Sequence, residues 1–144
     1  MQAERNLTTL LASLDPVQRD GEFVFAHIPG GEAALGTVVP QATVHEEEGL
    51  SVVLLREQAD QLDIRYDYTA AWLTLRVHSA LDAVGLTAAV SAALARAGLS
   101  CNVIAGYHHD HLLVPAERAS EALTLLRELA DISQRQASTE PVVQ

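Results

Sequence analysis

The sequence predicts an α+β protein whose second half has the split βαβ pattern of ferredoxin-like folds. From Trp72 to Leu129 the apolar pattern changes in the order strand, helix, strand, strand, helix. The first half contains three strand-like runs and two short helical segments in a different order. Two αβ layers around one core, or one continuous sheet, would accommodate both halves. We expect an antiparallel sheet in each half, with helices on one face.

The first half is expected to begin with a helix. Leucines between Leu7 and Leu14 have the spacing of one helix face, and Pro16 ends the segment because the residue before proline avoids helical geometry. Three short runs rich in branched side chains predict strands at 22–28, 38–44 and 50–55. A short helix is expected at 56–62, and the glycine-rich loop 30–36 is expected to be mobile.

The second half begins with strict alternation, which predicts a strand at 71–78. Leu73, Leu75 and Val77 share the face that we expect to contact the core. Trp72, on the other face, could line a pocket or close the edge of the core, and the same choice is open for Tyr107. The helix that follows has an apolar stripe of Leu86, Val90, Leu94 and Ala97.

The rest of the second half predicts a hairpin, a helix and a tail. Strands are expected at 101–105 and 111–114, joined by a turn. The last helix begins near Pro115, and its apolar stripe consists of Ala119, Ala122, Leu123, Leu126 and Leu129. The polar segment 133–144 does not continue the stripe, so we expect a flexible tail there.

Composition excludes several classes of function. The chain has 144 residues, with 9 Lys and Arg against 19 Asp and Glu, which gives a formal net charge of −10. Phosphate backbones and acidic lipids would repel such a chain, so neither nucleic acid nor a membrane is an expected partner. No apolar run approaches the ~20 residues that span a bilayer.

We also expect a cytoplasmic protein without enzymatic activity or a cofactor. The first six residues lack the basic flank and apolar run of a signal peptide, and the single cysteine, Cys101, cannot form an internal disulfide. Cys101 begins an apolar run and is expected to pack as a small hydrophobic side chain. The sequence contains no phosphate-binding loop, dinucleotide fingerprint, nucleophile elbow or zinc-protease motif.

The connection from 78 to 87 is the most informative segment for function. Asp82 is expected to be the N-cap of the following helix, and Gly85 leaves the backbone open to a neighbour or a ligand. Free amides and the positive end of the helix dipole favour a carboxylate at such a place. The alternative is a capped helix in which Gly85 serves close packing.

Four segments resemble the ACT domain, a small ferredoxin-like module that binds amino acids and regulates metabolic enzymes. The turn 82–86 and the segment 97–103 resemble the ACT domain in general. The longer stretches 42–50 and 106–115 resemble small stand-alone bacterial proteins made of two ACT-like halves, whose function is largely unassigned. The resemblance covers about 7 to 130, and it implies ACT-like halves at 1–68 and 69–132.

The resemblance implies a homodimer of ACT units paired edge to edge, with an amino acid or related metabolite bound at the seam. The turn would contribute Asp82, Ala83, Val84, Gly85, Leu86 and Thr87. The opposing strand would contribute Asn102, Val103 and Ile104. The ligand carboxylate would then meet the turn amides and its ammonium Asp82 or Asn102. A Gly85→Leu substitution is expected to remove binding while folding survives.

Two other functions remain open on the residues alone. One is a protein-interaction module without a ligand. The other is a metal-dependent enzyme centred on the cluster from His108 to His111, which includes His109 and Asp110. Zinc needs three or four such ligands, and in an extended segment only His109 and His111 would converge, so His78 or His27 would have to join them. A polar hairpin with no metal is the expected state of this cluster.

Overall fold

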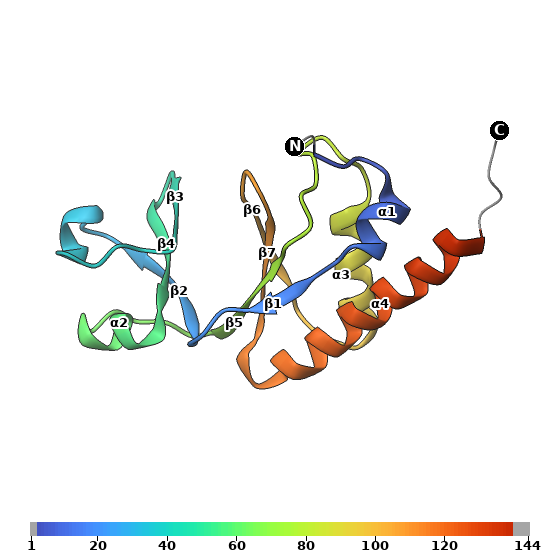
Figure 1. Cartoon of the computed structure of the whole chain (residues 1–144). Coiled ribbons are helices and arrows are strands. Elements are labelled where there is room, and N and C mark those ends of the chain that lie inside the picture. The colour runs from blue at the N-terminus through green and yellow to red at the C-terminus, as the bar shows by residue number, and fades with distance from the viewer. Residues whose placement is uncertain (1–2, 140–144) are drawn as a thin grey trace. The chain divides into compact units, whose positions relative to one another are not determined.

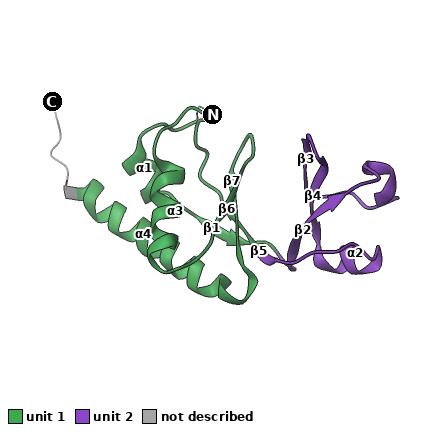
Figure 2. Ribbon diagram, turned by 180° about the vertical axis from the view of Figure 1, so that it is seen from behind, with its two compact units in different colours: residues 1–19, 72–144 green, residues 20–71 purple. Residues whose placement is uncertain are grey.

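The structure is a computed structural model that describes residues 3–139. Its chain divides into two units, shown in different colours in Figure 2. Unit 1 contains 1–19 and 72–144, and unit 2 contains 20–71. The N-terminal segment therefore belongs to the same unit as the C-terminal half of the chain.

Unit 2 contains a four-stranded antiparallel arrangement in the order β3-β4-β2-β5. Its strands are β2 (Phe23–Ile28), β3 (Ala42–Glu46), β4 (Gly49–Leu55) and the beginning of β5 (Thr69–Leu75). A 3-10 helix η1 (Glu32–Leu35) and a helix α2 (Arg56–Gln61) connect them. This is the strand order of a ferredoxin-like fold in which β5 is the fourth strand.

The core of unit 2 lies where β2 and β4 meet η1 and α2. Alternating residues of β2 and β4 point into it, as expected for strands with one buried face. The buried set consists of Val24, Ala26, Ile28, Leu35, Leu50, Val52, Leu54 and Ala59. Arg56, at the start of α2, pairs with Glu22 at 2.9 Å and donates to the Tyr66 hydroxyl at 3.0 Å, which fixes the helix at its beginning.

Unit 1 has the strand order β1-β5-β7-β6 (Figure 1). Its strands are β1 (Pro16–Gln18), the end of β5, β6 (Asn102–Ala105) and β7 (Asp110–Pro115). Since β7 lies between β5 and β6, the β5-α3-β6 unit is split as the sequence predicts. β1 pairs antiparallel with β5, Val17 opposite Thr74, and so supplies the fourth strand.

The helices of unit 1 are α1 (Leu7–Ala12), α3 (Leu86–Arg96), the 3-10 helix η2 (Ala116–Arg118) and α4 (Ala119–Thr139). Figure 1 shows α1, α3 and α4 together on one side of the strands. Their apolar faces are buried at Leu10, Leu86, Val90, Leu94, Ala122 and Leu126. Arg118 closes the end of α3 by donating to the carbonyls of Ala97 and Gly98 at 2.8 and 3.0 Å.

The predicted α+β, ferredoxin-like class is confirmed, and most elements lie where the sequence predicts them. Some segments differ from their predictions in extent or form. The strand expected at 38–44 is formed at 42–46, because Pro40 cannot donate to a strand partner. The loop 30–36 contains η1, anchored by the buried Leu35. Helix α4 continues to Thr139, seven residues beyond its expected end, and buries Ser133, whose hydroxyl donates to the Leu129 carbonyl at 2.8 Å.

The expected tail beyond Thr139 lies outside the described residues. Within the described part of the chain, no helix combines the length and the apolar character needed to cross a membrane.

Candidate functional site

The turn before α3 does not have the cap that its sequence predicts. Gly85 is the N-cap residue, in the left-handed conformation with φ of +100°, and no described side chain caps the helix. Asp82 is therefore not the N-cap. Its carboxylate instead accepts a hydrogen bond from Nε of Arg5 at 3.1 Å, in an ion pair between exposed side chains. The first amides of α3 are left without intrahelical acceptors, as at any helix start.

Gly85 is covered by helix α1. An ideal Cβ at this position would lie 3.1 Å from Cδ2 of Leu7. The backbone of Gly85 is thus in close contact with a leucine, and its positive φ by itself strains any larger residue. A Gly85→Leu variant is consequently unsuited to a binding test, contrary to the expectation from sequence that such a variant folds normally.

A groove of about 370 Å³ lies beside the turn, at the segment that follows β5. Two backbone hydrogen bonds join the segments that line it, from the Glu4 amide to the His78 carbonyl at 3.0 Å and from the Ala80 amide to the Glu4 carbonyl at 2.9 Å. The N-terminal segment thus pairs with the chain after β5. The groove is lined by Ala3, Arg5, His78, Ser79, Ala80, Leu81, Asp82 and Tyr107.

The N-terminal segment brings two charged side chains to this groove, and hydrogen bonds hold its backbone in place. The Glu4 carboxylate accepts the amides of Asn6 and Arg5, each at 2.8 Å, and these hydrogen bonds lower the pKa of Glu4 below its usual range. Asn6 caps α1 by accepting the Thr9 amide at 3.0 Å. The backbone that carries Arg5 is therefore held on both sides, which places a guanidinium beside Asp82.

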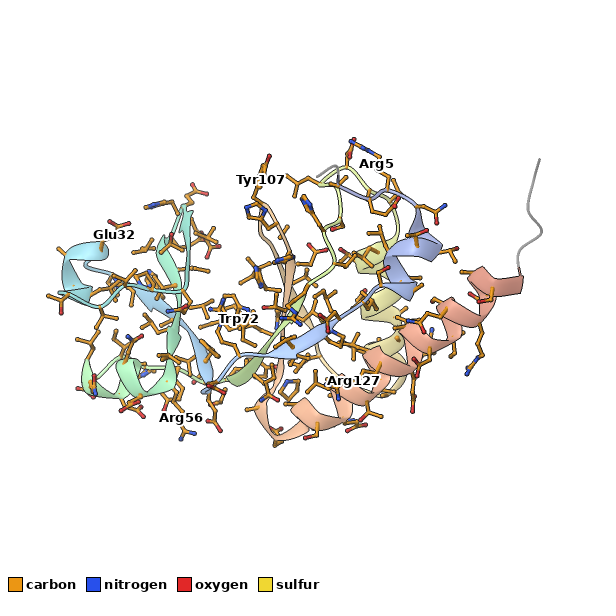
Figure 3. The ribbon with its side chains drawn as sticks, in the orientation of Figure 1. Arg5, Glu32, Arg56, Trp72, Tyr107 and Arg127 are labelled. Atoms are coloured by element: carbon orange, nitrogen blue, oxygen red, sulfur yellow. The ribbon has the colours of Figure 1, made fainter. Side chains whose placement is uncertain are left out.

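Three aromatic rings follow one another beside the groove. His78 and His108 have ring centroids 5.9 Å apart, and Tyr107 meets His108 edge to face at 5.1 Å. Tyr107 lies at the tip of the β6–β7 hairpin, and Figure 3 shows it and Arg5 at the same end of unit 1. His109 lies 3.5 Å from the Val77 carbonyl, so the hairpin tip touches the segment after β5.

Of the residues expected to contact a ligand, Asp82 lines the groove. Asn102, Val103 and Ile104 lie on β6, opposite Leu113, Leu112 and His111 of β7. Sequence reasoning does not single out Arg5, because its contact with Asp82 joins segments more than seventy residues apart, and nothing around it in the sequence indicates that pairing.

Two family models that describe the ACT domain match the chain, one at residues 2–71 and one at 68–128. A protein of unknown function from Vibrio cholerae is 44% identical, with a TM-score of 0.79, over 86% of this chain and 95% of that one. This chain belongs to the ACT-domain family. No curated protein matches it.

Two further solved structures are similar to this ACT protein in fold. A protein from Agrobacterium tumefaciens is 20% identical, with a TM-score of 0.64, over 81% of this chain and 89% of that one. The regulatory subunit of aspartate kinase from Thermus thermophilus is 12% identical, with a TM-score of 0.62, over 81% and 97% of the two chains.

The histidine cluster of this ACT protein has partners other than a metal. Nδ1 of His111 accepts a hydrogen bond from Trp72 Nε1 at 3.1 Å, and the Thr74 hydroxyl lies 3.0 Å from the same nitrogen. His109 faces the Val77 carbonyl, so the two histidines expected to converge contact different groups. Among the described residues, no three His, Cys, Asp or Glu side chains are placed to hold a metal ion.

His111 is held in its neutral form. Because the Trp72 indole can only donate, Nδ1 must accept and carries no proton. Burial lowers the pKa of His111, and the charges of Arg19 and His109 lower it further, whereas Asp110 raises it. The Arg19 guanidinium lies 4.2 Å from the centre of the buried Trp72 ring, on the same cluster.

Cys101 lies just before β6 and is partly buried. Burial raises the pKa of its thiol, so the thiolate that a nucleophile requires is disfavoured. This agrees with its interpretation as a small packing residue.

We predict that Gly85→Ala destabilises unit 1 more than Gly98→Ala. Both glycines have positive φ, which costs an L-residue about 1–2 kcal/mol. A Cβ at Gly98 would meet nothing within 4 Å, whereas one at Gly85 would press on Leu7. Urea unfolding monitored by Trp72 fluorescence measures both losses. The contact with Leu7 is disproved if the difference between the two variants is unchanged in a Leu7→Ala background.

The low pKa of His111 predicts that stability falls as the pH drops below about 6.5, the ordinary value for histidine. Above that pH neither state binds the proton. Below it the unfolded chain takes up a proton that folded His111 resists, so folding becomes less favourable until the folded pKa is reached. Free energies of unfolding at pH 7.5 and 5.5 measure this loss.

The matched variant is His111→Asn, whose amide oxygen can still accept from Trp72. Its stability should depend less on pH across this range than that of the wild type. His45→Asn, at an exposed position of β3, is the matched control for the same change of residue type away from Trp72. Equal pH dependence in wild type and His111→Asn would exclude His111 as the source.

Proposed function

We propose that this chain is a non-catalytic regulatory protein of the cytoplasm that senses an amino acid or a related metabolite. Its membership in the ACT-domain family supports a regulatory role. The fold likeness to the regulatory subunit of an aspartate kinase is consistent with that role. We place the ligand in the groove beside the turn 82–87.

The observation that carries this proposal is the ion pair between Arg5 and Asp82 in a groove of about 370 Å³. A free amino acid carries one carboxylate and one ammonium on neighbouring atoms. The carboxylate would take Arg5 and the ammonium Asp82, so that each charge of the ligand meets its opposite. The volume lies within the range of small-molecule sites, about 300–1,000 Å³.

The start of α3 would strengthen the hold on the carboxylate. This helix of 11 residues begins at Leu86, its N-cap Gly85 has no capping side chain, and its positive end favours an anion nearby. We keep as proposed backbone contacts Ala83, Val84, Leu86 and Thr87. Gly85 is not kept among them, because Leu7 covers it.

Ligand binding would act by tying two distant segments together. Arg5 belongs to the N-terminal segment and Asp82 to the chain after β5, and two backbone hydrogen bonds already join these segments. A ligand that bridges them stabilises the joined state by its difference in affinity for the joined and separated states. A partner that recognises the joined state would then respond to the metabolite.

We predict that at least one of the twenty amino acids raises the melting temperature of the full chain. Ligand at a hundredfold excess over Kd stabilises a protein by about 2.7 kcal/mol. Arg5→Gln and Asp82→Asn should each weaken the affinity by about tenfold or more, since a hydrogen bond between charged groups is worth about 1.5–3 kcal/mol. Isothermal calorimetry measures these affinities.

The control is a second exposed ion pair of unit 1, between Arg76 and Asp15 at 2.7 Å. Asp15→Asn removes a charge from a similar pair away from the groove and should leave the affinity unchanged. Equal losses in Asp15→Asn and Asp82→Asn would show a general charge effect and contradict the site.

We propose in addition that the protein is a homodimer. Within the described residues, β3 and β6 each pair with a strand on one side, to β4 and β7 respectively, and such edges favour association with another strand. Asn102, Val103 and Ile104 lie on the edge strand β6 and would reach the ligand of a second copy. Sedimentation velocity at micromolar concentration should give twice the mass of 15.4 kDa, and a monomer at all concentrations would overturn this.

A second candidate function is an interaction module without a ligand. Exposure of large apolar side chains favours it, since Leu81, Val84 and Tyr107 are 68%, 82% and 77% exposed around the same turn. This function would replace the first if no amino acid or related metabolite bound.

A further inference from the structure

We infer that the ligand of the groove is an amino acid with an aromatic side chain. This inference rests on the proposed amino-acid site and adds the class of side chain that the site accepts. Two features support it: rings lie beside the groove, and the main-chain charges of a bound amino acid would occupy both charged residues that line the groove.

Aromatic side chains form part of the lining of the groove. His78 and Tyr107 line the groove, and His108 lies against both of them, with centroid distances of 5.9 and 5.1 Å. Aromatic pairs prefer centroid distances of about 4.5–7 Å, so the three rings support one another. Tyr107 is held edge to face against His108 and still leaves 77% of its surface exposed.

The charged groups of the groove leave little for a charged side chain to bind. Arg5 and Asp82 are the guanidinium and the carboxylate among its described lining residues, and the two charges of the ligand's main chain would use both. Glu4, the other carboxylate of the N-terminal segment, already accepts the amides of Arg5 and Asn6. A third charge on the ligand would therefore lie beside rings and Leu81 without an unused opposite charge. A neutral side chain is therefore favoured over that of lysine, arginine, aspartate or glutamate.

Ring stacking then separates aromatic from aliphatic side chains. Leu81 and Ala80 offer apolar surface to either kind, whereas His78 and Tyr107 offer ring faces and edges that gain from a ring on the ligand. The exposed Tyr107 has room to cover such a ring, because it is at the tip of the hairpin. Phenylalanine, tyrosine and tryptophan are the free amino acids that have this chemistry.

The test is calorimetry on the full chain at pH 8 with phenylalanine, tyrosine and tryptophan against leucine, methionine, lysine and aspartate. Phenylalanine should bind about tenfold more tightly than leucine. Tyr107→Leu should remove this preference by weakening phenylalanine binding while changing leucine binding less than about twofold. Tyr107→Phe, which keeps the ring, should retain the preference. Since Tyr107 is mostly exposed, the melting temperature of both unliganded variants should match that of the wild type.

The outcomes distinguish a failure of the aromatic class from a failure of the proposed amino-acid sensing. If leucine, methionine, lysine or aspartate binds as tightly as phenylalanine, or if Tyr107→Leu weakens leucine and phenylalanine equally, the aromatic class is overturned while amino-acid sensing stands. If no amino acid binds the wild type, the sensing function and the aromatic class both fall.

Discussion

The fold depends on the need of each ferredoxin-like unit for a fourth strand, which its own βαββα segment does not supply. β5 completes unit 2 through its first residues, where Ala70 pairs with Phe23. Unit 1 obtains its fourth strand from β1, whose Val17 pairs with Thr74 near the end of the same β5. The N-terminal segment must therefore belong to unit 1, although most of the first half belongs to unit 2. The two ACT segments of the sequence are consequently not the two units of the structure.

The position of the groove follows from that constraint. Once β1 is paired with β5, the preceding helix α1 packs on α4 and α3, and the residues before α1 reach the chain that leaves β5. Arg5 meets Asp82 there, Leu7 covers Gly85, and the β6–β7 hairpin brings Tyr107 to the same place. The groove thus consists of three segments distant in sequence, and each is positioned by sheet pairing rather than by its own local preference.

Local sequence patterns predict the secondary structure correctly where an element depends mainly on its own residues. The alternation around Leu73 predicts β5, the stripe that includes Val90 predicts α3, and turn residues separate β6 from β7. The structure confirms these elements, although β5 spans Thr69–Leu75 rather than the expected 71–78. The prediction of Asp82 as an N-cap is wrong because its carboxylate can accept a hydrogen bond either from a nearby backbone amide or from a guanidinium distant in sequence. Sequence spacing indicates only the nearby amide. β1 is missed for a related reason. Three residues beginning with Pro16 have no strand pattern of their own and become a strand only because β5 offers an edge.

The weakness of the Arg5–Asp82 pair is what would suit it to binding. Both side chains are largely exposed, at 65% and 73%, and an exposed ion pair contributes only about 0.2–1 kcal/mol. Separating it to admit a zwitterion would cost little, because each charge regains an opposite charge from the ligand. The backbone around it is held more firmly, by the paired amides of Glu4 and Ala80 and by the Asn6 cap of α1. The two charged side chains can therefore exchange each other for the charges of a ligand while the backbone stays in place. A ligand could then be bound without a rearrangement of the fold.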